Sequence, residues 1–66
     1  MYVIKNNTTD KYIAIDHSSG GYPYDVNVAS AKVFYLLEDA VEYKSMFYKN
    51  DWTIHELIIE TKPILN

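Results

Sequence analysis

The sequence predicts an α+β domain: a small antiparallel sheet of three to four strands with one α-helix packed on one face, in the order ββαβ. Two short segments rich in β-branched and aromatic residues flank a polar cluster, which is typical of a hairpin. Apolar residues at three- and four-residue spacing then indicate a helix, and strand character returns after it. Because the chain has 66 residues, we expect a single domain, residues 1–66.

The first two strands are expected at residues 1–5 (MYVIK) and 11–16 (KYIAID). The cluster NNTTD between them is rich in side chains that hydrogen-bond to their own backbone and favour turns, so a hairpin is predicted. Successive side chains of a strand point to opposite faces. On this basis we expect the face opposite the helix to carry Tyr2, Ile4, Tyr12 and Ala14. Such an uncovered apolar face indicates an interface, with a second copy or with another protein.

Residues 17–26 (HSSGGYPYDV) are predicted to be an irregular connection that redirects the chain. Gly20 and Gly21 permit positive φ, and Pro23 fixes its own φ. After it, Asp25 or Asn27 is placed to cap a brief helical turn, and residues 32–34 are expected to be a short extended piece.

The predicted helix spans residues 36–50 (LLEDAVEYKSMFYKN). Acidic residues lie in its first turns and lysines in its last, which is the arrangement that the helix dipole favours, and Asn50 is the expected terminator. Its expected apolar stripe consists of Leu37, Ala40, Val41, Phe47 and Tyr48.

The last strand is predicted over residues 51–62 (DWTIHELIIETK), with Pro63 closing it. Leu57, Ile58 and Ile59 are consecutive apolar residues, so both faces of this strand are expected to be covered. A central position in the sheet would provide that cover.

Composition narrows the classes of function. The chain is 48% hydrophobic, which is too apolar for a disordered segment, and it has no cysteine, so neither a disulfide nor a thiolate metal site is predicted. Nine acidic residues, six scattered lysines and no arginine make a small acidic protein of net charge -3, which disfavours nucleic acid as a partner. No apolar run approaches the length of a membrane span, so we expect no membrane partner and a soluble, unexported chain.

Two groups of residues invite a catalytic or metal-binding interpretation. Asp16 and His17 precede Ser18 and Ser19, but neighbours on a strand point to opposite faces, so a polar strand end entering a turn is the better interpretation. His55 and Glu56 do not form a metal-ligand pattern with His17, and His55 is predicted at the solvent side or the edge of the core. We therefore predict no catalytic residue, no metal, no cofactor and no small-molecule substrate: the protein is not an enzyme.

Aromatic residues give the stronger prediction, because tyrosine brings large, stiff contact area to an interface at low entropic cost. The alternative is that several tyrosines simply complete a small core. The acidic helix face, which includes Asp39, either mimics nucleic-acid phosphates or is an ordinary solvated face. The predicted partner-binding residues are Tyr2, Tyr12, Tyr22, Tyr24, Glu38 and Glu42.

Several short patterns occur in order along nearly the whole chain: YVI at residues 2–4, KYI at 11–13, A-K-x-F at 31–34, E-x-A-x-x-Y at 38–43, and a last strand rich in Ile and Glu at 54–60. In this the chain resembles small uncharacterised accessory proteins encoded by bacteriophages. Such proteins often carry Ser or Thr at the helix N-cap, whereas Leu36 takes that place here.

The resemblance implies a phage protein that acts in the host cytoplasm. It implies a non-enzymatic protein that binds and inhibits or modulates a host protein, such as an enzyme, a transcription factor or a component of a defence system. No catalytic residue is carried over, because the pattern contains none. The alternative is a self-assembling, homodimeric small protein with no host target.

Overall fold

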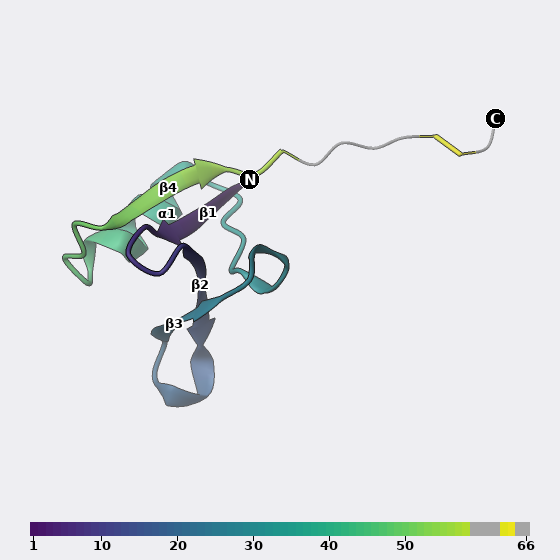
Figure 1. Cartoon of the computed structure of the whole chain (residues 1–66). Coiled ribbons are helices and arrows are strands. Elements are labelled where there is room, and N and C mark those ends of the chain that lie inside the picture. The colour runs from purple at the N-terminus through teal and green to yellow at the C-terminus, as the bar shows by residue number, and fades with distance from the viewer. Residues whose placement is uncertain (59–62, 65–66) are drawn as a thin grey trace.

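In the described part of the chain, four antiparallel strands and one α-helix make up the fold, which is α+β as predicted (Figure 1). The computed structural model describes residues 1–58 and 63–64. The sheet has the order β3-β2-β1-β4. The elements are β1 (Tyr2–Asn6), β2 (Lys11–Asp16), the 3₁₀ turn η1 (His17–Ser19), β3 (Tyr22–Val26), the 3₁₀ turn η2 (Val28–Ser30), α1 (Leu37–Ser45) and β4 (Trp52–Glu56).

The predicted first hairpin is confirmed, since β1 and β2 pair antiparallel with Lys5 opposite Tyr12. Its turn is held by Asn6, whose side-chain oxygen accepts the backbone N–H of Thr8 at 3.0 Å and of Thr9 at 3.4 Å. This is the local side-chain-to-backbone bonding for which Asn is favoured in turns.

The extended piece predicted at residues 32–34 lies between β1 and β2, where it bonds to both strands. Tyr2 and Phe34 exchange two backbone hydrogen bonds of 2.8 Å, and the N–H of Lys32 donates to the carbonyl of Ile13 at 3.0 Å. The segment therefore links the two strands beyond the end of their own paired residues.

The predicted order ββαβ was wrong, because residues 22–26 form a third strand, β3, instead of an irregular connection. β3 pairs antiparallel with β2, with Ala14 opposite Tyr24 and Asp16 opposite Tyr22. The helical turn predicted after this segment is confirmed as η2, with Asn27 at its N-cap position, although no side-chain bond caps it.

Pro23 is tolerated in β3 because of the direction of its backbone. Gly21 donates its N–H to the carbonyl of Asp16, whereas the carbonyl of Ile13 accepts from Lys32 on the other side. Backbone N–H and C=O groups alternate in direction along a strand, so those of the even-numbered residues of β2 point toward β3. Pro23 pairs with the odd-numbered Ile15, so the backbone groups of Pro23 point to the free edge of the sheet. Its missing N–H therefore leaves no bond of the sheet unmade.

The helix is shorter than predicted, and only part of its predicted stripe is buried. α1 begins after Leu36, which makes no side-chain cap bond, and ends at Ser45, five residues before the expected terminator Asn50. Tyr48, with a φ of 50°, follows the last turn in the left-handed region. The buried side of α1 is Ala40, flanked by the half-buried Tyr43 and Phe47, while Leu37, Val41 and Tyr48 are exposed.

The prediction of a long, central last strand was also wrong. β4 ends at Glu56 and lies at the edge of the sheet that the described residues form, with β1 as its neighbour in the strand order. Leu57 continues the pairing by one backbone bond, donating its N–H to the carbonyl of Met1 at 2.7 Å, and Ile58 is exposed. Residues 59–62 of the predicted strand lie outside the described residues.

The core lies between the sheet and α1, which packs against β1 and β4 and is seen behind them in Figure 1. Four aromatic rings connect in sequence through it, with centroid distances of 5.9, 5.0 and 5.8 Å: Phe34, Tyr43, Phe47 and Trp52. The buried residues of this cluster are Ile4, Ile13, Phe34, Ala40 and Trp52, and Tyr2, Ile15 and Ile54 pack against them.

Tyr2 and Ile4 therefore face the core, and their expected place beside Tyr12 and Ala14 was wrong. Because Lys5 pairs with Tyr12, the even-numbered residues of β1 share a face with the odd-numbered residues of β2. The register of β1 against β2, which the turn sets, decides which residues of the two strands share a face. The alternation of side chains within each strand does not reveal this register.

Candidate functional site

Tyr12, Tyr22 and Tyr24 lie on one face of the hairpin formed by β2 and β3, and we call these three residues the tyrosine surface. Tyr24 is directly across from Ala14, and Tyr22 is across from Asp16, so both tyrosines share the face of the even-numbered residues of β2. Tyr22 is 66% exposed and Tyr24 is 52% exposed, while Tyr12 is half-buried. The structure thus gathers three of the four predicted tyrosines.

The turn between β2 and β3 places Tyr22 opposite Asp16, at the start of β3. Asp16 accepts the backbone N–H of Ser18 at 3.0 Å and the hydroxyl groups of Ser18 at 2.6 Å and Ser19 at 2.9 Å. These hydroxyl bonds lower the pKa of Asp16. Gly20 and Gly21 follow with φ values of 82° and 85°, which only glycine adopts readily. The prediction of a polar strand end entering a turn is confirmed, since Asp16 is the N-cap of η1 and its carboxylate accepts both serine hydroxyls.

The remaining predicted partner-binding residues lie elsewhere. Tyr2 is half-buried and packs against the core. Glu38 and Glu42 are exposed on α1, one helical turn apart. The acidic residues therefore belong to a different element from the tyrosine surface.

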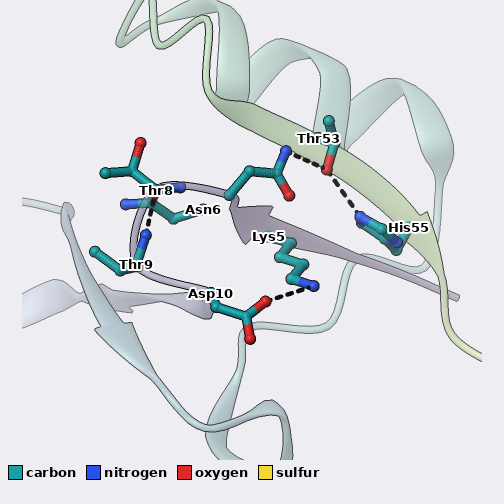
Figure 2. A network of polar contacts seen from close by, with 8 residues as sticks. Lys5, Asn6, Thr8, Thr9, Asp10, Thr53 and His55 are labelled. Atoms are coloured by element: carbon teal, nitrogen blue, oxygen red, sulfur yellow. Dashed lines mark hydrogen bonds and ion pairs between the residues drawn. The ribbon is translucent and has the colours of Figure 1, made fainter.

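A polar network that the sequence did not predict joins the β1–β2 turn to β4 (Figure 2). The Lys5 ammonium lies 2.8 Å from the Asp10 carboxylate and 5.9 Å from the centroid of the Tyr12 ring. This ion pair raises the pKa of Lys5 and lowers that of Asp10, chiefly through their hydrogen bond. Local sequence patterns could not predict this network, because Lys5 lies beside Tyr12 and Thr53 only through the pairing of β1 with β2 and β4.

The second half of the network contains a hydroxyl–imidazole pair. The side-chain amide of Asn7 donates to the hydroxyl oxygen of Thr53 at 3.1 Å, and that oxygen lies 2.8 Å from Nε2 of His55 (Figure 2). The Thr53 hydroxyl can accept the Asn7 amide hydrogen and still serve as donor or acceptor to the imidazole, because a hydroxyl oxygen has two lone pairs and one hydrogen. His55 is exposed, as predicted for a solvent-side residue.

This pair holds the turn against β4, and it does not form a triad. Asp51 adds a further bond, accepting the hydroxyl of Thr8 at 2.6 Å, and that bond lowers the pKa of Asp51. Within residues 1–58 and 63–64, no three His, Cys, Asp or Glu side chains come together as a metal-binding group.

A groove of about 520 Å³ runs between α1 and β4. The residues that line it are Val41, Lys44 and Ser45 from α1, and Trp52, Thr53 and Ile54 from β4. It is separate in the chain from the tyrosine surface, since none of its lining residues belongs to β2 or β3.

In the described part of the chain, no helix has the length and apolar character needed to cross a membrane. No protein-family model, no curated protein and no solved structure matches the chain.

Proposed function

We propose that the chain is a non-enzymatic binding protein that docks on a partner protein through the tyrosine surface. The observation that supports this is the exposure of Tyr22 and Tyr24, 66% and 52%, side by side with Tyr12 on one face of an edge hairpin. Tyrosine supplies apolar area and a hydroxyl group from a ring with few rotatable bonds, which is why it is enriched in interfaces.

The hairpin that carries these tyrosines is held before any partner arrives. The Asp16 cap, the two glycines of the turn and the bond from the Tyr43 hydroxyl to the carbonyl of Gly21, 2.9 Å long, restrain its end. Restraint of this kind lowers the entropic cost of association, so a small surface can bind specifically.

We place the partner in a bacterial host, on the basis of the resemblance to phage accessory proteins, and propose that binding inhibits or modulates that host protein in the host cytoplasm. The chain carries a net charge of -3, so a partner surface with a basic rim would add favourable long-range attraction.

The test compares two double variants in a bacterial lysate. Tyr22→Ala with Tyr24→Ala removes the exposed rings of the tyrosine surface. Tyr35→Ala with Tyr48→Ala removes two other exposed tyrosines and serves as the matched control. We expect a partner that is retained by the tagged wild-type chain and by the control, and is lost with the first variant.

The partner is then purified and titrated against all three chains by calorimetry. Loss of two interface tyrosines should weaken binding by at least about thirtyfold, the effect of about 2 kcal/mol. A partner that binds the Tyr22/Tyr24 variant and the control equally would show that docking uses another surface.

A further inference from the structure

Among the residues that the structure describes, no strand pairs with the outer edge of β4. Leu57 donates its N–H to the carbonyl of Met1, so the backbone N–H and C=O groups of the odd-numbered residues in this strand point toward β1. Alternation then directs the backbone N–H and C=O groups of Ile54 and Glu56 to the free edge. Unlike β3, this strand contains no proline, and an unpaired edge of this kind accepts a further strand.

The groove runs along this edge, with α1 as its other wall. Val41 is 50% exposed there, and Leu37 lies one turn earlier on the same side of the helix and is also exposed. α1 therefore has a second apolar side, directed toward the free edge of β4, in addition to the side that Ala40 buries against the sheet.

We propose that a second copy of the chain occupies this groove and forms a homodimer. The two β4 strands pair antiparallel about Ile54, so that two four-stranded sheets become one continuous sheet. In this register Ile54 of one copy lies across from Ile54 of the other, and Trp52 lies across from Glu56. Four backbone groups at the centre, the N–H and C=O of each Ile54, find partners.

The charges at the groove support this register. Lys44 lines the groove together with Trp52. The side chain of Glu56 lies on the face that carries α1, because Glu56 pairs with Tyr2, which packs against the core. Pairing about Ile54 therefore brings Glu56 of the second copy beside Lys44, once on each side of the dimer.

In the part of the chain that the structure describes, Lys44 and Glu56 form no ion pair with each other. Trp52 and Glu56 are four residues apart on β4, which is about 13 Å along an extended strand. The pairing of Lys44 with Glu56 is thus a property of two copies, and charge exchange can test it.

The placement of the two helices also suits the dimer. α1 contacts both β1 and β4. A two-fold axis perpendicular to the sheet and between the two β4 strands keeps both copies of α1 on the same face of the continuous sheet, one on each side of the axis. Leu37 and Val41 of each copy face the other helix and become covered.

The experiment measures the molar mass of the purified chain by light scattering and sedimentation across the micromolar range. We expect a dimer for the wild type. Lys44→Glu and Glu56→Lys should each weaken dimerisation by about tenfold, and the double exchange should restore it, because each copy then supplies both charges in reverse. Glu42→Lys, an equal change of charge on the solvent side of α1, is the control and should dimerise as the wild type does.

Circular dichroism confirms that each variant is folded, since all three positions are on helix or strand surfaces. A monomeric wild type would overturn the proposal, and so would a dimer that Lys44→Glu leaves unchanged or that the double exchange fails to restore. The outcome is independent of the proposed function: the Tyr22/Tyr24 variant should remain dimeric, and loss of partner binding in it says nothing about β4.

Discussion

The hydroxyl group of Tyr43 donates a hydrogen bond of 2.9 Å to the backbone carbonyl of Gly21. This bond connects the middle of α1 to the end of the β2–β3 hairpin, 22 residues away in the sequence. Burial of the Tyr43 side chain raises its pKa, so the group is a neutral donor throughout the physiological range. The helix therefore helps to hold the strand from which Tyr22 and Tyr24 project.

Tyr43→Phe should destabilise the protein by about 1 kcal/mol, since it removes one partly buried hydrogen bond and leaves the carbonyl of Gly21 without that partner. In a domain of this size the melting temperature should fall by about 5 °C. Thermal unfolding followed by circular dichroism measures this. Tyr35→Phe, at an exposed tyrosine, is the control, and an equal fall in both variants would contradict a specific role for the bond.

Asp16 gives the hairpin a predictable response to acid. Its pKa lies below the ordinary value of 3.8, first because of the hydroxyls of Ser18 and Ser19. A carboxyl whose pKa is lower in the folded state stabilises the fold above its unfolded pKa, and this contribution is lost as the pH falls through the folded value. Ser18→Ala with Ser19→Ala should raise the pKa of Asp16 toward 3.8, as measured by an NMR titration of its side chain.

The same double variant should be less stable than the wild type at neutral pH, and the difference should disappear below the folded pKa of Asp16. Urea unfolding at a series of pH values measures this difference. A stability difference that persisted unchanged at the lowest pH would attribute the effect of the serines to something other than the aspartate.

A substitution at Ile4 tests whether this residue lies on the core face of the sheet. Its side chain is fully buried between the sheet and α1, so Ile4→Ala should cost about 3 kcal/mol through lost burial and the cavity that remains. Val28→Ala, which removes an exposed apolar side chain, should cost little. Urea unfolding of the two variants decides between the faces, because an Ile4 that faced solvent would give equally small effects in both.

Tyr48 follows the last turn of the helix with a φ of 50° and a side chain that is 90% exposed. A non-glycine residue pays a steric penalty in this region, and glycine does not. Tyr48→Gly should therefore stabilise the protein by about 0.5–1 kcal/mol. Tyr48→Ala keeps the strained backbone and removes the same ring. An equal gain in stability for Tyr48→Ala would therefore show that the effect comes from loss of the ring.

The parts of the fold that could be predicted are those that local patterns determine. Polar turn residues between two β-branched segments predicted the first hairpin, and helical spacing located α1, although only Ala40 of the predicted stripe became fully buried. The polar strand end at Asp16 was predicted to enter a turn from the same local chemistry, whereas the bonds from Ser18 and Ser19 to its carboxylate were not predicted.

The parts that could not be predicted depend on contacts between distant residues. β3 was missed because Pro23 and the preceding glycines have the composition of a loop, and only the sheet order shows that Pro23 faces a free edge. Tyr2 was assigned to the wrong face because the register of β1 against β2 is set by the turn. Of the candidate site, the exposed pair Tyr22 and Tyr24 was predicted, whereas their support by Tyr43 was not.

Pro23 also limits how far the sheet can be extended. A chain that pairs through β4 uses the edge that is rich in free backbone donors, and the outer edges that remain are both β3, where the proline offers no N–H. In the proposed dimer, growth by strand addition would therefore stop at two copies instead of continuing into a fibre. Such a closed pair presents its tyrosine surfaces at its two far ends, so a partner with two sites, or two partners, would be held by both ends at once.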